Sequence, residues 1–298
     1  MENNNPTQPQ FVFRKEREFG EIISDSFSFF TQNYKSILNI FLKFVGPFIL
    51  LSVIATTFYQ YKVGALLSDV TAFASPDILV SAFAENSWVI ILLIITSVAT
   101  NIILYGTVLH IIKSYMNNSG EIVEGDISQG LKNDFWKLFG YLFLVSLVTI
   151  IGFAICFLPG IYLAIVLAPG IGILIMENES VSEAFTKSFT LIKNNWWITF
   201  ATFLVFIILI AILGFVFQLP AFIYTIVESF TAVQKSSDPS AITDIYQNWV
   251  YLLFTAIGSL GQLFLSIFTV IMVALVYFNL SEKQEFTGTY EQIDQIGN

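Results

Sequence analysis

The chain has 298 residues, of which 55% are hydrophobic and only 12% are charged, and its mean hydropathy is +0.74. Soluble domains carry about 25% charged residues, so this chain has too few charges to cover a water-facing surface, and lipid is its natural solvent. The net charge of −9 argues against a nucleic-acid partner. A single cysteine, Cys156, and a single histidine, His110, exclude an intramolecular disulfide and the usual metal sites built from several such side chains, and we expect no cofactor.

The uncharged runs of the chain predict an all-α membrane bundle of about six transmembrane helices. A span needs about 20 apolar residues, and the charged residues that bound each run indicate where the chain returns to the membrane surface. The polar segments 1–17 and 286–298 are expected to flank a single membrane domain over residues 18–285. The predicted spans cover residues 38–60, 88–112, 138–158, 161–176, 196–219 and 248–280.

The third and fourth spans are predicted from one long uncharged stretch, which runs from Leu138 to Met176. This stretch is too long for a single crossing and fits two short ones. Pro159 and Gly160 lie near its middle, where we expect a tight turn. A re-entrant hairpin is the alternative, and only four segments would then cross the membrane completely.

The fifth and sixth spans are each longer than a crossing requires. The uncharged run from Asn194 to Val227 is too short for two spans and a turn, so we interpret it as one helix that continues past Pro220 and is tilted or kinked there. The run from Ile245 to Ser281 is also interpreted as a single span.

The lysines and arginines predict the orientation, because positive charges collect on the cytoplasmic side of a membrane. With six spans, only Lys62 and Lys235 fall on the opposite side, while Lys43 lies within the first span. We therefore expect a multi-pass protein of a bacterial inner membrane with both termini in the cytoplasm. The basic residues assigned to the cytoplasmic side are Arg14, Lys15, Arg17, Lys35, Lys113, Lys132, Lys137, Lys187, Lys193 and Lys283.

Residues 20–33 and 182–195 indicate an internal repeat, with a fainter copy at 128–135. The predicted unit is a short amphipathic helix at the membrane interface followed by a hairpin of two spans. Ser180 and Glu183 have the spacing of a capping box that would start the second such helix. These helices could form a platform for lipids or partners, although an elbow that turns the chain into the next span is the plainer interpretation. The identical pairs are Glu21 and Glu183, Ser26 and Ser188, Phe27 and Phe189, and Asn33 and Asn195.

Five intramembrane positions are candidates for function. Lys43 is a charge inside the first span, although its long stem can carry the ammonium to the interface. His110 could pass protons near neutral pH, while an ordinary hydrogen bond near the interface is the plainer interpretation. Asn101 and Gln262 could bind a solute or form hydrogen bonds between helices. Pro169 interrupts the fourth span, either as the broken helix of a transporter or as a kink in a tightly packed helix.

Several motifs resemble one bacterial family. Residues 158–162 (Leu-Pro-Gly-Ile-Tyr), 176–177, 182–189 and 194–197 resemble the central signature of the glycerophosphodiester phosphodiesterase membrane domain and its stand-alone relatives, and residues 276–280 are similar to the ending of that family. In relatives that hydrolyse glycerophosphodiesters, catalysis belongs to a separate soluble barrel domain. This chain has no room for that domain, so the resemblance implies a membrane module of the cell envelope and carries over no active-site residue.

The leading functional hypothesis is a non-enzymatic membrane protein that organises lipids or other membrane proteins. It rests on the expected interfacial helices and on the absence from the sequence of a P-loop, a nucleophile elbow, a zinc-protease helix and paired carboxylates inside a span. The second hypothesis is a transporter of a small solute or a lipid, which Pro169, Asn101 and Gln262 would serve. An intramembrane enzyme is the weakest hypothesis, because the sequence offers no buried pair of acid, base or nucleophile.

Overall fold

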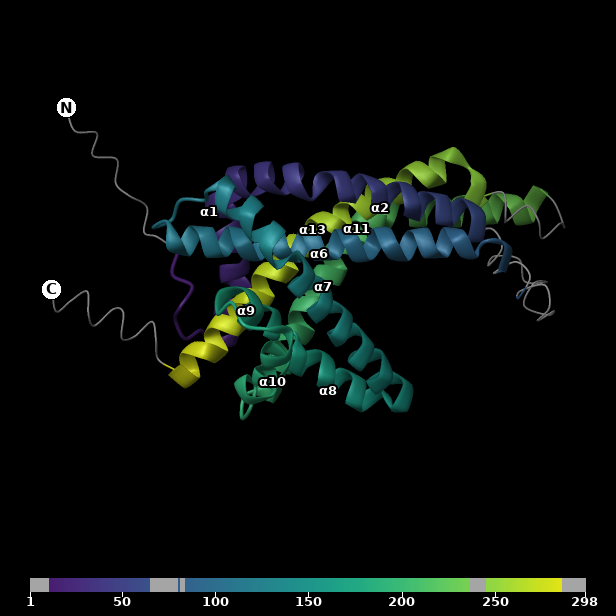
Figure 1. The fold of residues 1–298 in the computed structure, drawn as a ribbon. Helices are drawn as coiled ribbons and strands as arrows, with labels where there is room; N and C mark the ends of the chain where they lie inside the picture. The colour runs from purple at the N-terminus through teal and green to yellow at the C-terminus, as the bar shows by residue number, and fades with distance from the viewer. Residues whose placement is uncertain (1–10, 65–79, 81–83, 236–244, 286–298) are drawn as a thin grey trace, which may run out of the picture. The chain divides into compact units, whose positions relative to one another are not determined.

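The computed structural model describes residues 11–64, 80, 84–235 and 245–285, and almost all of these are helical, with no strand among them (Figure 1). The longer helices follow one another along the chain, and a short π-helical turn at Gln60–Gly64 follows the second. Their bounds are α1 Phe19–Phe44, α2 Gly46–Tyr59, α6 Ser87–Asn117, α7 Glu124–Ile155, α8 Phe157–Leu167, α9 Gly170–Met176, α10 Val181–Leu191, α11 Trp196–Lys235 and α13 Trp249–Glu285.

Five stretches of helix in the described chain are long and apolar enough to cross a membrane, and the number becomes six if α1 and α2 together form one broken span. This confirms the coarse prediction of an all-helical chain with five to six long apolar helices. The hairpin arrangement and the interfacial helices stay predictions. The five candidates are Ser87–Asn117, Glu124–Ile155, Phe157–Met176, Trp196–Ala232 and Trp249–Gln284.

The helices break at points that differ from the predicted turns. The first predicted span is interrupted at Val45, and Pro47 lies in the first turn of α2. Pro159 also lies in a first helical turn, that of α8, because the N–H groups there have no acceptor inside the helix and a missing one costs little. The chain turns instead at Cys156, whose backbone is extended. Gly160 serves the packing of α8 on α7, since a Cβ at this position would lie 2.4 Å from the ring of Phe153.

The three segments of the proposed repeat form helices of different lengths. Ser180 caps α10 with the predicted capping box, and α10 ends before Asn194, which has the left-handed backbone that stops a helix. Residues 20–33 and 128–135 are the first parts of the long helices α1 and α7 and do not form short helices of their own. No proline follows in either helix to end it early.

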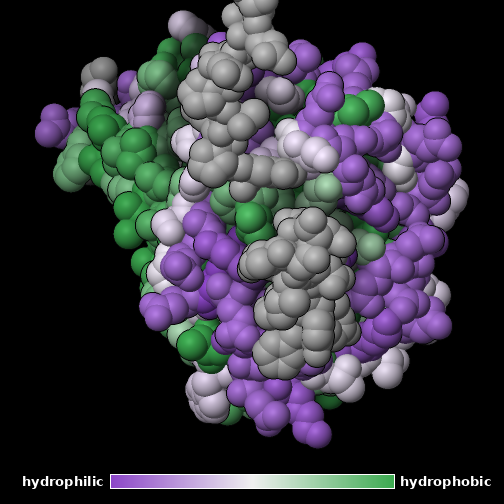
Figure 2. All heavy atoms as spheres, turned by 90° about the vertical axis from the view of Figure 1, so that its left-hand side faces the viewer, coloured by the Kyte–Doolittle hydropathy of each residue, from purple (hydrophilic) through white to green (hydrophobic). Residues whose placement is uncertain are grey.

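The chain divides into two compact units. Unit 1 comprises Met1–Leu42, Ile102–Ile207 and Ile267–Asn298, and unit 2 comprises Lys43–Asn101 and Ile208–Ser266. In unit 1, almost every side chain of α13 from residue 267 to residue 280 is buried, so this stretch forms the centre of its core. Figure 2 views the side on which α13 ends, and hydrophilic side chains spread over most of this face while hydrophobic ones gather toward one edge.

Unit 2 depends on close approach of α11 and α13 at glycines. A Cβ added at Gly214 would lie 2.4 Å from the Gln262 side chain, and one added at Gly258 would lie 2.5 Å from that of Gln218. A Cβ at Gly261 would lie 2.3 Å from an aromatic ring of α11. These glycines therefore mark where two helices pack, and α13 continues through Gly258 and Gly261 without a turn.

Candidate functional site

The five positions singled out in the sequence are divided between the two compact units. Lys43, Asn101 and Gln262 belong to unit 2, whereas His110 and Pro169 belong to unit 1. Lys43 lies in the last turn of α1 and is exposed. The structure therefore offers separate local environments to consider, and the chemistry of each follows from its own neighbours.

Asn101 and Gln262 have local roles. Asn101 is exposed, and its side-chain amide donates to the carbonyl of Ser97 in the same helix at 2.9 Å. Gln262 is also exposed, and its side chain lies over Gly214 of the neighbouring helix. Gln262 therefore has a structural role in the packing of α11 against α13, and Asn101 has one in a hydrogen bond within α6.

His110 lies in a polar cluster formed by α6 and α7. Its side chain is buried, and its Nε2 lies 3.3 Å from a carboxylate oxygen of Asp134. His110 Nε2 makes no hydrogen bond to any described residue, so the contact with Asp134 is one of proximity. The other oxygen of Asp134 lies 3.6 Å from the ammonium of Lys137. Gly130 makes room for the imidazole, because a Cβ there would lie 2.3 Å from His110 Nδ1.

A polar pocket of about 380 Å³ adjoins this cluster, and two lysines connect it to the end of α9. The Lys113 ammonium donates to the Ile175 carbonyl at 2.5 Å, and the Lys137 ammonium donates to the Asn178 side chain at 2.9 Å. Cations at the carboxyl end of a helix satisfy its free carbonyls and complement its dipole. The two lysine contacts join α6 and α7 to the end of α9 and the loop after it. Their role is therefore structural.

The break at Pro169 is held by two hydroxyl groups. Tyr141 donates to the carbonyl of Leu167 at 2.6 Å, and its oxygen lies 3.3 Å from Ser188 Oγ. Only glycine fits at position 170, because a Cβ there would lie 1.9 Å from the Tyr141 hydroxyl and 2.0 Å from Ser188 Oγ. Tyr141 and Ser188 are both buried. The interruption is thus a closely packed joint.

An apolar crevice of about 450 Å³ lies beside this joint. Its walls come from α6, α7, α8, α9 and α13, with side chains such as Val145, Ala164 and Ile171. Hydroxyl groups come from Tyr105, Tyr141, Ser146 and Thr149, and Thr149 Oγ1 is buried without a hydrogen-bond partner among the described residues. The lining is otherwise that of a site for a hydrocarbon chain.

The segment of residues 11–18, here called the N-terminal strap, crosses the polar end of unit 1 and is anchored by Arg17. The Arg17 side chain is fully buried, and its guanidinium donates to the Asp25 carboxylate at 2.9 Å and to the Phe13 carbonyl at 2.6 Å. It also donates to the carbonyl of Val12. Burial lowers the pKa of Arg17, and the hydrogen bond and negative charge of Asp25 oppose that shift.

Aromatic packing and hydrogen bonds connect the strap to three helices. Phe13 is 2% exposed, and its ring centroid lies 4.9 Å from that of Phe29 in α1, 6.0 Å from Tyr115 in α6 and 5.5 Å from Phe278 in α13. The backbone N–H of Arg17 donates to the Asn279 side-chain oxygen at 2.8 Å. The start of the described chain is therefore tied to the last turns of α13.

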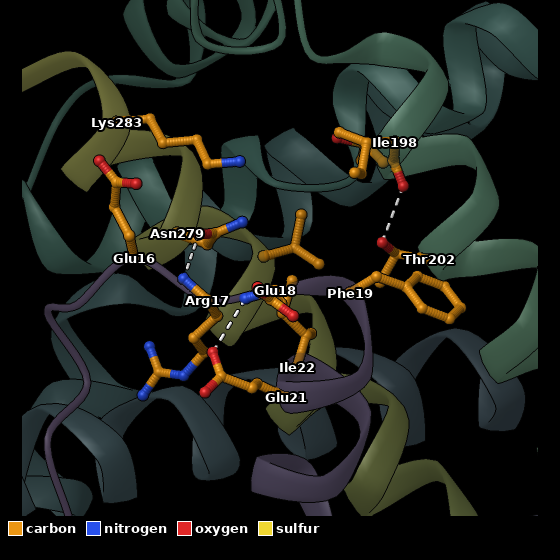
Figure 3. Close-up of a pocket in the computed structure, with 12 residues that line it drawn as sticks. Glu16, Arg17, Glu18, Phe19, Glu21, Ile22, Ile198, Thr202, Asn279 and Lys283 are labelled. Carbon is orange, nitrogen blue, oxygen red and sulfur yellow. Dashed lines mark hydrogen bonds between the residues drawn. The ribbon is translucent and has the colours of Figure 1, made fainter.

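A pocket of about 460 Å³ lies between the strap, the first turn of α1, and parts of α11 and α13 (Figure 3). Its lining combines charged groups with apolar side chains of the helices. Glu21 accepts the backbone N–H of Glu18 at 2.9 Å. The lining residues are Glu16, Arg17, Glu18, Phe19, Glu21, Ile22, Ile198, Thr199, Thr202, Val276, Asn279 and Lys283.

No protein-family model, no curated protein and no solved structure matches the chain. The resemblance to the glycerophosphodiester phosphodiesterase membrane domain therefore rests on its motifs alone, and the functional argument rests on the geometry. Tyr141, Arg17 and Asn279 carry much of that geometry, and sequence reasoning assigned none of them to a site. Arg17 was counted only as a charge, and Asn279 entered only as part of residues 276–280, which are similar to the ending of that family.

Proposed function

We propose that the chain is a non-enzymatic, multi-pass protein of a bacterial inner membrane that organises lipids, holding an acyl chain in the crevice beside Pro169. The crevice is the observation that carries this proposal. Its walls belong to helices that are apolar enough to span a membrane, and its volume of about 450 Å³ suits a small ligand. In hydrocarbon surroundings an acyl chain is the occupant at the highest local concentration.

The packing at the break favours a holding role over transport. The Tyr141 hydroxyl satisfies the Leu167 carbonyl, and Gly170 leaves no free volume between Tyr141 and Ser188. A joint this closely packed resists the rearrangement that alternating access requires. The polar residues that would serve a transporter, Asn101 and Gln262, belong to unit 2 and do not line the crevice.

Contacts between the two ends of the described chain support the proposed topology. The N–H of Arg17 bonds to the side chain of Asn279, and the Phe13 ring packs against Phe278. Two ends in contact lie on the same side of a membrane, which requires an even number of crossings. Six spans satisfy that requirement, and the distribution of lysine and arginine favours the cytoplasm for both ends.

Matching local geometry supports the proposed repeat. Glu21 and Glu183 each accept the backbone N–H three residues before them, at 2.9 and 3.1 Å. Ser26 and Ser188 are both fully buried, and each donates to the carbonyl four residues earlier at 2.7 Å. Membership among the stand-alone relatives of the glycerophosphodiester phosphodiesterase membrane domain is proposed on the motifs alone.

The proposal is tested by filling the crevice from two of its walls. Ala164→Phe and Val145→Phe each place a ring in the space meant for the acyl chain, and Leu147→Phe, on the exposed surface of the same helix as Val145, is the matched control. Native mass spectrometry of protein extracted with its surrounding lipid should detect a bound lipid on the wild type and on the control, and far less on either filled variant. Equal lipid on all four proteins would contradict the proposal.

A further inference from the structure

We propose that the pocket under the N-terminal strap binds the headgroup of a phospholipid that carries both a phosphate and a primary amine, as phosphatidylethanolamine does. This inference deepens the proposed function and rests on it, because it names the lipid class that the protein organises. The argument begins with the two nitrogen donors on α13 and then considers the carboxylates that face them.

Asn279 presents an oriented amide donor to the pocket. Its side chain is 5% exposed, and its oxygen accepts the N–H of Arg17, which orients the amide nitrogen away from the strap. That nitrogen makes no hydrogen bond to any described residue, and Figure 3 shows it projecting into the pocket. Asn279 is almost fully buried as a residue while this nitrogen opens onto the pocket, so it is a fixed donor that a ligand acceptor in the pocket can use.

Lys283 places a positive charge beside that donor. It lies four residues after Asn279 on α13, so the two side chains share one face of the helix. In Figure 3 the Lys283 ammonium and the Asn279 amide nitrogen project toward the same space, and the ammonium forms no ion pair with a described residue. An amide N–H and an ammonium together suit the anionic oxygens of a phosphate.

The opposite wall is acidic. Glu16, Glu18 and Glu21 line the pocket, and the negative charge of Glu21 acts on the nearby Arg17, whose guanidinium is bonded to Asp25 and to strap carbonyls. A phosphate alone would therefore meet more carboxylates than cations, and this balance repels a purely anionic headgroup. A headgroup that also carries an ammonium satisfies both walls.

A metal ion does not account for the carboxylates. Within the described ranges, no group of three Asp, Glu, His or Cys side chains is placed to hold one. A primary ammonium needs no such convergence, since its three N–H groups can reach acceptors that are spread apart. The quaternary amine of a choline headgroup has no N–H, so it would lose these bonds.

The pocket lies where spans meet water, which favours a lipid over a soluble molecule. Ile198 and Val276 line it and belong to candidate spans, and Phe19 and Ile22 add apolar surface from α1. Trp197, in the first turn of α11, is exposed, as is typical of the aromatic belt at a membrane interface. A lipid with its headgroup at the polar wall would leave its glycerol near these apolar side chains.

The test offers the full-length protein phosphatidylethanolamine, phosphatidylcholine and phosphatidylglycerol with identical acyl chains, and native mass spectrometry measures which is retained. The wild type should retain the ethanolamine lipid about tenfold over the other two. Asn279→Asp keeps an oxygen for the Arg17 N–H and replaces the donor with an anion, so the strap stays in place while the preference falls to near onefold. Lys283→Met should do the same, and Lys193→Met, an exposed lysine outside the pocket, should not.

Each other outcome overturns a defined part of the account. Equal retention of all three lipids by the wild type, with loss in the crevice variants, would refute the headgroup assignment and leave the acyl-chain proposal standing. No retention of any lipid would refute both. Displacement of the bound lipid by free phosphoethanolamine at equal concentration would show a soluble ligand and refute the lipid assignment.

Discussion

Replacing Gly170 by alanine should damage the joint at Pro169. The added Cβ would lie 1.9 Å from the Tyr141 hydroxyl and 2.0 Å from Ser188 Oγ, and both hydroxyls donate to helix carbonyls, those of Leu167 and Ala184. Relieving the overlap moves the hydroxyls and breaks one or both bonds, and each lost bond in a buried site costs about 1–3 kcal/mol. The expected loss in the free energy of unfolding is therefore about 2–5 kcal/mol.

Titration with sodium dodecyl sulfate in mixed micelles, followed by circular dichroism, measures that loss. Gly125→Ala is the matched control, because nothing lies within 4 Å of its added Cβ. It should be neutral or stabilise by up to about 1 kcal/mol. Combining Gly170→Ala with Tyr141→Phe and Ser188→Ala removes both overlapping oxygens and should recover part of the loss. The reasoning is refuted if Gly170→Ala lies within about 0.5 kcal/mol of the wild type.

Three further substitutions test other contacts. Ser180→Ala should cost about 1 kcal/mol, because the hydroxyl caps α10. Hydrogen bonds from Ser180 lower the pKa of Glu183 below its ordinary 4.5. The capping box therefore contributes its full stability above that ordinary value, and the stability is lost as the pH falls through the lowered pKa. The difference between wild type and Ser180→Ala in thermal unfolding should thus narrow at low pH, and a constant difference would contradict the capping-box account. Asp134→Ala and Lys137→Ala each remove one side of a partly exposed ion pair at 3.6 Å, so each should lower the free energy of unfolding by less than about 1 kcal/mol. A loss above about 2 kcal/mol for either variant would contradict that estimate.

The number and type of the long helices could be predicted from the sequence because the signal is simple. Charged residues bound each apolar run, and no other feature of the chain competes with that pattern. The long helix through Pro220 followed from the same reasoning, since the run was too short for a second span.

The breaks were harder to predict because a proline stops a helix only in some positions. Pro159 falls in a first helical turn, where its missing N–H has no consequence, so the expected turn moved to Cys156. Pro169 does separate two helices, and the carbonyl of Leu167 accepts a hydrogen bond from the Tyr141 hydroxyl. That partner lies in a different helix, and no local pattern shows it.

The pocket under the N-terminal strap could not be predicted, for a related reason. Its residues come from the strap, α1, α11 and α13, and their meeting depends on tertiary packing. Arg17 was counted only as a charge that indicates orientation, yet its guanidinium is buried and shapes the strap. Asn279 lies in an apolar run, where a single amide is more often a bond between helices than part of a site.

Cys156 supplies the most direct measurement of the central claim, that this chain is a multi-pass membrane protein in which α7 and the α8–α9 pair each cross the bilayer. It is the only cysteine, and it is exposed where α7 turns into α8. A membrane-impermeant maleimide added to intact spheroplasts should label the wild type at Cys156. The Cys156→Ser variant, which has no thiol, should remain unlabelled. In that background, Ser119→Cys, which is exposed in the loop between α6 and α7, should be labelled only after permeabilisation. Labelling of Cys156 only after permeabilisation would contradict the account, because α7 would then not reach the outer face.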